Sequence, residues 1–173
     1  FKWAPAEDAK YMLVSCSARQ ADKPADTVVE QKEQTKVLFN ADSAMSYIKK
    51  QTDLGPRNPG SEAHRLAAAY LAGELKRHNP DTLITYVNPA VMPDGKKIDV
   101  TNIMGRWGTD KKSRILLLAH YDTRPVADRD PDPANRDKPI VGANDGASGV
   151  GVLLEVARLI NQSMPQIGID ILF

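Results

Sequence analysis

One histidine and two aspartates in the second half of the chain have the types and spacing of a metal site. His120 and Asp122 follow the apolar run RILLLA at 114–119, with one residue between them. Side chains two residues apart in an extended segment point the same way, so both can face one site. Asp145 stands in a glycine-rich segment ahead of an apolar helix, whose dipole favours the ionised carboxylate. Imidazole nitrogen and carboxylate oxygen are both zinc ligands in proteins.

Each of these features also has a purely structural interpretation. His120 and Asp122 could form a hydrogen-bonded pair at the end of a strand. Asp145 could simply cap the helix that follows it. Ligands of open α/β sheets bind beyond the carboxyl ends of the strands, where both clusters are expected, so their combination favours a metal site. The spacing alone does not name the metal.

The elements that would position these residues are predicted from hydrophobic periodicity and from turn and cap residues. A first helix has Asp42 and Ser43 as cap candidates, and a second helix begins at Ser61. His64 and His78, on and near the second helix, are predicted to lie at the surface. Strands are expected over 82–87, 100–107, 114–119 and 167–173, and a third helix is expected to open near Gly146. This order predicts an α/β fold: a three-layer α/β/α sandwich with a mixed, mostly parallel sheet.

The chain is predicted to contain one domain and one arm. Residues 1–39 are expected to form a flexible N-terminal arm, because much of this stretch is polar and has little apolar surface to bury. Residues 40–173 are expected to form the N-terminal part of the α/β domain. The strand at 167–173 reaches the last residue with no turn after it, so we expect the domain to be C-terminally truncated in this sequence.

The amino-acid composition argues against several classes of protein. The 173 residues are 42% hydrophobic and carry a net charge of +1, which argues against a nucleic-acid surface. No apolar run is long enough to span a bilayer. The single cysteine, Cys16, excludes an internal disulfide. Its context LVSCS is similar to a bacterial lipid-attachment box, but the residues before it are mixed and acidic. Lipid attachment and a free thiol therefore both remain open.

The segment 124–144 is long for a loop in a compact domain, which favours a lid or a wall that shapes a substrate site. Asp128, Asp130 and Asp132 alternate along it, as calcium ligands can. Proline occupies the positions where an EF-hand loop needs its glycine and glutamate, however, so a solvated charged loop is expected.

Three segments resemble a known family. The stretches LLLAHYDTRPVADRD and PIVGANDGASGVGVLLEVAR, with LGPRNPGSEAHR before them, are similar to bacterial glutaminyl-peptide cyclotransferases (glutaminyl cyclases), which belong to the clan of zinc-dependent aminopeptidases. The resemblance implies that Asp145 is a zinc ligand and that His120 is a metal ligand, which in the two-metal peptidases of the clan holds the second ion. The cyclases work with one zinc, so one metal and two metals both remain open. The resemblance implies a supporting role in the catalytic site for Asp122.

The resemblance also implies an activity and a setting. A cyclase converts the N-terminal glutamine of a peptide or protein to pyroglutamate and releases ammonia, with zinc as the cofactor. A zinc-dependent aminopeptidase is the alternative, and a non-catalytic binding relative is the second alternative. Such proteins act in the bacterial cell envelope or periplasm, with which lipid anchoring through Cys16 is compatible. The family's catalytic glutamate and remaining ligands follow the strand that matches 167–173, so the 173-residue chain by itself is expected to be inactive and to bind zinc poorly.

Overall fold

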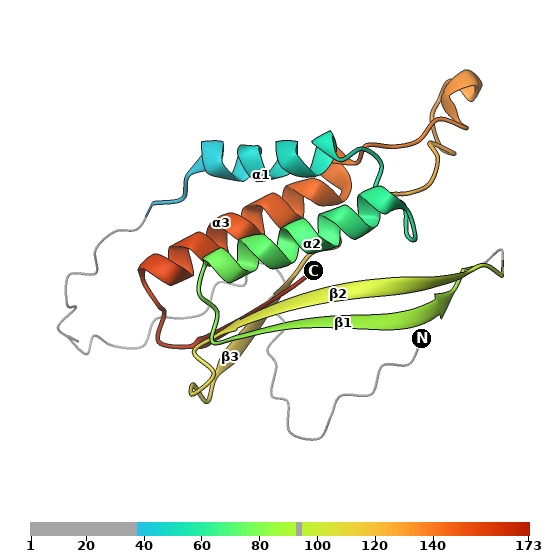
Figure 1. Ribbon diagram of the computed structural model, residues 1–173. Helices are drawn as coiled ribbons and strands as arrows, with labels where there is room; N and C mark the ends of the chain where they lie inside the picture. The colour runs from blue at the N-terminus through green and yellow to red at the C-terminus, as the bar shows by residue number, and fades with distance from the viewer. Residues whose placement is uncertain (1–37, 93–94) are drawn as a thin grey trace, which may run out of the picture.

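The computed structural model describes residues 38–92 and 95–173, which form three α-helices and one four-stranded sheet (Figure 1). Apart from Leu38 and Phe39, the predicted arm at 1–39 lies outside the described residues, and so does Cys16. The elements in chain order are α1 (Ala41–Asp53), α2 (Glu62–Arg77), β1 (Thr82–Val91), β2 (Lys97–Trp107), β3 (Arg114–Leu118), a 3₁₀ turn (Pro133–Asn135), a π turn (Ala143–Ser148), α3 (Gly149–Gln162) and β4 (Gly168–Leu172).

The strands lie in the order β1, β2, β4, β3. β1 and β2 form an antiparallel hairpin in which Thr82 pairs with Arg106 and Val91 with Lys97. β4 pairs antiparallel with the end of β2 and parallel with β3, so the sheet is mixed. Helix α3 connects β3 to β4, and a crossover of this kind allows successive strands to run parallel.

The three helices lie together over one face of the sheet (Figure 1). The predicted α/β class and mixed sheet are confirmed, but two details of the prediction differ. The described residues place helices on one face rather than two, and two of the three strand pairs are antiparallel rather than parallel. β1 and β2 are antiparallel because no helix separates them, which lets the two strands pair as a hairpin.

The helix starts follow from capping side chains. Asn40, rather than the predicted Asp42 or Ser43, caps α1: its side chain accepts a hydrogen bond from the Ser43 amide at 3.0 Å. Ser61 caps α2 as predicted, and its hydroxyl accepts from the amide three residues later. Among the described residues, no helix combines the length and the apolar character needed to cross a bilayer.

The apolar core lies between the helices and the sheet. Apolar side chains of α3 recur at helical spacing and meet those of α2 and of the two central strands. Fully buried members of this core are Ala67, Leu71, Leu75, Ile103, Ala147, Val150, Leu154, Ala157 and Ile171. This packing fixes the start of α3 above the carboxyl end of β3.

Two histidines belong to the interior. His64 and His78, predicted to be at the surface, are 6% and 8% exposed. His64 in α2 stacks on the ring of Tyr121. His78 caps the end of α2, and its backbone carbonyl accepts a hydrogen bond from the Trp107 indole at 2.9 Å. The surface prediction was wrong because it rested on residue type rather than on helix face.

The face of the sheet opposite the helices carries one buried charge. The carboxylate of Asp170 in β4 is 1% exposed and lies between two arginines of the neighbouring strands. The Arg106 Nε and Arg114 Nε atoms donate to it at 3.0 and 3.1 Å. This ion cluster ties β2 and β3 to the central strand β4.

Candidate metal site

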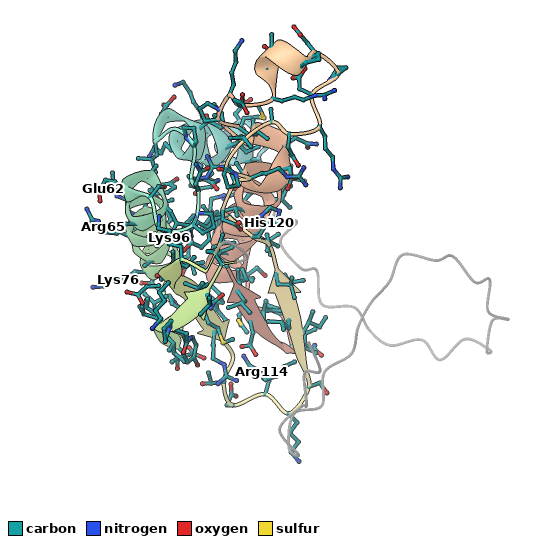
Figure 2. The ribbon with its side chains drawn as sticks, turned by 90° about the vertical axis from the view of Figure 1, so that its right-hand side faces the viewer. Glu62, Arg65, Lys76, Lys96, Arg114 and His120 are labelled. Carbon is teal, nitrogen blue, oxygen red and sulfur yellow. The ribbon has the colours of Figure 1, made fainter. Side chains whose placement is uncertain are left out.

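His120, Asp122 and Asp145 meet at the carboxyl end of β3. His120 and Asp122 lie in the segment that follows the strand, and Asp145 lies in the π turn that precedes α3. The parallel β3–α3–β4 unit brings the start of its helix over the end of its first strand, which is where ligands bind in such folds. Figure 2 shows His120 at this end of the strand, with Arg114 at the other end.

The imidazole of His120 stands between the two carboxylates. Its Nε2 atom is 2.8 Å from Oδ1 of Asp145, and its Nδ1 atom is 3.2 Å from Oδ1 of Asp122. The side chains of His120 and Asp145 are 57% and 86% exposed, so a solvated ion can reach the contact between them. The structure therefore brings together the three residues that the sequence singled out.

The two carboxylate contacts of His120 cannot both be hydrogen bonds of a neutral imidazole. A neutral imidazole has one N–H and can donate to one of the two carboxylates only. The second contact needs either another proton or a metal ion in its place. If the Nδ1 proton points to Asp122, the Nε2 lone pair faces Asp145, and a cation held between Nε2 and Oδ1 satisfies both atoms.

The geometry argues against a role for Asp145 as a helix cap. Its φ and ψ of −110° and 98° are extended, as those of a cap residue would be, but its side chain is 86% exposed and contacts the His120 imidazole. The backbone is helical from Gly146 on, as predicted, and α3 follows at Gly149. Within the described residues, neither the π turn nor α3 has a side-chain cap hydrogen bond. The carboxylate thus faces His120 and solvent rather than the helix amides.

Two glycines leave room for this arrangement. A Cβ atom on Gly146 would stand 2.7 Å from Cε1 and 2.8 Å from Nδ1 of His120 and would collide with its carbonyl oxygen. Gly142 has a φ of +63°, and a Cβ there would meet Thr123 and the carbonyl oxygen of Asp145. The backbone of the turn therefore packs directly on the histidine ring and on the strand end.

A buried scaffold below the site was not found from the sequence. Arg57, in the turn before α2, is fully buried and donates to the carbonyl of Tyr121 at 2.8 Å. The Tyr121 ring stacks on His64 with centroids 4.8 Å apart, and its hydroxyl donates to the Thr101 carbonyl at 2.9 Å. The one available signal was a charged residue inside the proline-rich turn GPRNPG.

The negative charge of Asp122 acts on this scaffold. Burial raises the pKa of Tyr121 to about 12, and the Asp122 carboxylate adds to the effect. Burial lowers the pKa of Arg57 and of His64, and in both cases Asp122 opposes the change. Asp122 therefore partly compensates the buried cation, in addition to its contact with His120.

The long charged loop extends beyond the site and is drawn in orange at the upper right of Figure 1. Its aspartates serve the loop itself: Asp130 and Asp132 accept hydrogen bonds from backbone amides two residues further along, and Asp128 pairs with Arg124. These contacts agree with the predicted solvated charged loop. The predicted function as a lid or substrate wall remains a prediction.

A hollow of about 370 Å³ opens beside His120 and Asp122. It lies at the carboxyl edge of the sheet, and most of its lining is apolar. The apolar lining residues are Pro59, Met92, Ile98, Val100, Leu118, Ala119, Leu172 and Phe173. A space of this kind next to polar, ion-binding groups suits a small ligand or the end of a peptide.

The donor set fits zinc but is incomplete in the part of the chain that the structure describes. An imidazole nitrogen and a carboxylate oxygen face each other, and zinc accepts both. No group of three or more His, Cys, Asp or Glu residues able to hold one metal ion occurs in that part. Catalytic zinc has three protein ligands as a rule, so His120 and Asp145 would form two thirds of such a set.

The chain is similar to known proteins over the segment that contains these residues. Residues 102–173, which contain all three site residues, match the family model described as Peptidase family M28. The chain spans 20% to 32% of the length of four curated relatives that it matches. One of them is a probable zinc metalloprotease of Pyrenophora tritici-repentis, 22% identical over an alignment of 143 positions that covers 74% of this chain.

Several proteins of known structure have higher sequence identity to this chain. A glutaminyl cyclase of Tannerella forsythia is 53% identical with a TM-score of 0.71, and a leucine aminopeptidase precursor of Bacteroides thetaiotaomicron is 48% identical with a TM-score of 0.76. A Zn-dependent exopeptidase of Parabacteroides distasonis is 47% identical with a TM-score of 0.71. Each match covers 78% of this chain and 46% of the other chain. In sequence and in fold, the chain is thus similar to bacterial glutaminyl cyclases and zinc-dependent exopeptidases, which confirms the resemblance found in its sequence.

Proposed function

We propose that the full-length protein is a zinc-dependent enzyme that converts the N-terminal glutamine of peptides to pyroglutamate and releases ammonia. The observation that carries this proposal is the 2.8 Å approach of His120 Nε2 to Asp145 Oδ1 at the carboxyl end of β3. Zinc is the metal supported by the relatives described as zinc-dependent, and glutaminyl cyclases are among the most similar solved structures.

The described residues would contribute ligands and orientation. Asp145 Oδ1 and His120 Nε2 would bind the ion, while Asp122 would hold the Nδ1 proton and so fix the tautomer of the imidazole. When bound, zinc would supply a Lewis acid that polarises the γ-carbonyl of the substrate glutamine.

The substrate's own α-amine would then attack the carbon of that side-chain amide carbonyl, Cδ. A carbon–nitrogen bond forms within the substrate, the bond to the side-chain amide nitrogen breaks, and the proton of the amine leaves with the ammonia. Holding the two reacting groups of one molecule close together supplies much of the rate gain. The apolar hollow beside His120 could hold the residues that follow the glutamine.

An aminopeptidase remains the second candidate, because a leucine aminopeptidase precursor and a Zn-dependent exopeptidase are about as similar to the chain as the cyclases are. The same ligands would then serve hydrolysis, in which water rather than the α-amine is the nucleophile. The products separate the two candidates. A cyclase yields a peptide of the same length whose mass is lower by one ammonia. An aminopeptidase yields a free amino acid and a shorter peptide.

The test uses the purified full-length protein, peptides that begin with glutamine or leucine, and mass spectrometry. We expect loss of ammonia from the glutamine peptide and no free amino acid from either peptide. Asp145→Asn should remove the bound zinc and lower the rate by more than about 100-fold, a loss larger than that of an outer partner of a ligand. Asp110→Asn is the matched control, because Asp110 is exposed in the turn at the opposite end of β3.

Three results would contradict the proposal in different ways. Release of free leucine or glutamine would replace the cyclase by the aminopeptidase. Absence of both products from a folded, zinc-loaded protein would favour a non-catalytic binding relative. Full zinc content in Asp145→Asn would reject the ligand assignment itself.

A further inference from the structure

We infer that Arg57 is a positioning residue of the metal site, whose guanidinium fixes the distance between the segment of His120 and Asp122 and the turn of Asp145. The inference rests on the proposed function, since it takes His120 and Asp145 as the ligands. It concerns a residue outside the three site residues, on the turn that leads into α2.

Arg57 is fully buried, and in the described part of the chain its guanidinium donates to backbone carbonyls rather than to a carboxylate. The carbonyls belong to three separate segments. They are Tyr121 (2.8 Å), Gln51 (3.1 Å), Gly55 (3.3 Å), Val141 (2.9 Å) and Gly142 (3.0 Å). Since a guanidinium is planar and presents its donors in fixed directions, the segments that it binds are held in a fixed relative position.

The carbonyls bound by Arg57 are next to the site residues. Tyr121 is the residue between His120 and Asp122, so the Nε bond fixes the segment that carries both. The Gly142 carbonyl accepts from Arg57 Nη2 and also from the Ala147 amide at 3.2 Å, which closes the turn around Asp145. One rigid side chain thus joins the two segments whose approach forms the metal-binding contact.

Further hydrogen bonds and close contacts hold the same segments in place. The Thr123 amide donates to the Arg57 carbonyl at 3.1 Å, and the Thr123 hydroxyl donates to Asn58 at 3.0 Å. A Cβ atom on Gly142 would lie 3.3 Å from Arg57 Nη2 and would collide with Thr123. A shift of the guanidinium would therefore be passed on to the strand end and to the turn.

Burying the charged guanidinium of Arg57 costs free energy, which a residue that only filled space would not need to spend. Removing a guanidinium from water without a carboxylate in contact is unfavourable unless each donor finds an acceptor. An apolar side chain could fill the same volume but could not orient carbonyls. Unlike an apolar side chain, the arginine makes directed hydrogen bonds to the carbonyls of Tyr121 and Gly142, and both bonds help to set the geometry of the site.

The test compares Arg57→Lys with Arg114→Lys in the full-length protein. Arg114 is also largely buried, but it binds Asp170 and lies at the end of β3 away from His120 (Figure 2), about 20 Å along the strand. A lysine keeps the charge but cannot join three segments. We expect Arg57→Lys to weaken zinc binding by about 10- to 100-fold and to alter the visible absorption spectrum of bound Co²⁺, whereas Arg114→Lys leaves both unchanged.

Arg57→Ala with added methylguanidinium gives a second measurement. The small cation can replace the lost group in its cavity, so millimolar methylguanidinium should restore part of the zinc affinity to this variant and none to Asp145→Asn. Circular dichroism and thermal unfolding report whether each variant is folded at the temperature of the binding measurement.

The outcomes separate the inference from the proposed function. Loss of zinc in Asp145→Asn with wild-type affinity and Co²⁺ spectrum in Arg57→Lys would reject the positioning role alone. If the Arg57 variants do not fold while Arg114→Lys does, Arg57 is a requirement for folding and the positioning role is likewise rejected. A wild-type protein that binds no zinc would overturn both.

Discussion

His120 uses its two ring nitrogens differently. Nδ1 is surrounded by acceptors, since both the backbone carbonyl and Oδ1 of Asp122 lie 3.2 Å from it. With a cation bound between Nε2 and Asp145, the imidazole proton would therefore be on Nδ1, where Asp122 accepts it. Asp122, which the sequence suggested as a supporting residue, is well placed to select the tautomer that binds a metal.

The contact of Gly146 with the imidazole gives a prediction at the same scale. Gly146→Ala should weaken zinc binding by at least about tenfold, because the new methyl group would overlap the ring and carbonyl of His120 and turn the ring away from Asp145. Competition with a chromogenic chelator measures the change in dissociation constant. An unchanged constant would mean that the ring can move without loss.

Gly73→Ala is the matched control for that substitution. Gly73 lies on the exposed side of α2, and no atom stands within 4 Å of a Cβ placed on it. Alanine is favoured over glycine in a helix, so the free energy of unfolding should rise by about 0.5–1 kcal/mol while zinc affinity stays the same.

At the scale of elements, the end of α2 is fixed by His78. Its carbonyl accepts from Trp107 in β2, and its imidazole is buried, with Nε2 lacking a hydrogen-bond partner among the described residues. Burial lowers the pKa of His78; Glu74 opposes this change, and Arg158 adds to it. The neutral imidazole is therefore the form that packs between the helices.

This burial predicts an acid-sensitive helix layer. Because the pKa of His78 is lower in the folded than in the unfolded chain, the unfolded chain binds the proton more readily. The stability that His78 contributes is present above its ordinary pKa of about 6.5 and decreases as the pH falls below that value. In urea unfolding, His78→Leu should therefore lose less stability than the wild type between about pH 7.5 and about pH 5.5.

The comparison isolates His78 because the carboxyl groups titrate in both proteins. An equal loss of stability in the variant and the wild type over this pH range would show that His78 does not contribute. The remaining acid sensitivity is expected to include His64, whose pKa burial also lowers.

At the scale of the whole molecule, the number of metal-binding side chains determines the expected zinc affinity. The described residues bring two donors to one point, and no larger group of metal-binding side chains occurs among them. The 173-residue chain produced by itself should therefore bind zinc more weakly than the full-length protein, by more than the roughly 10- to 100-fold that the loss of an outer partner costs. Isothermal titration of both proteins measures the difference, and tight stoichiometric zinc in the chain alone would contradict it.

Local patterns in the sequence were enough to predict part of this structure. The Ser61 cap, the strands β3 and β4 and the side-by-side position of His120 and Asp122 depend on neighbours a few residues away. Periodicity and capping record such contacts directly. The proximity of His120 and Asp145 could be predicted from the sequence, because in a βα unit the start of the helix lies near the end of the strand.

Other features depend on partners far away in the sequence. Arg57 and His64 are buried because the carbonyls of Tyr121 and Gly142 and the ring of Tyr121 meet them from segments more than 50 residues away. The insertion of β4 between β2 and β3 likewise follows from packing and not from any local signal. A single sequence contains no record of such pairings, so His64 and His78 were assigned to the surface by residue type.

Strand β3 forms the outer border of the described sheet, and Leu118 at its end is 67% exposed. A border strand offers a row of peptide groups to any second strand of compatible length, and an apolar residue beside that row favours the addition. Copies of the isolated chain could therefore join edge to edge as their concentration rises. Titrations of that chain should accordingly be made in dilute solution, with light scattering to verify that the particles remain monomeric.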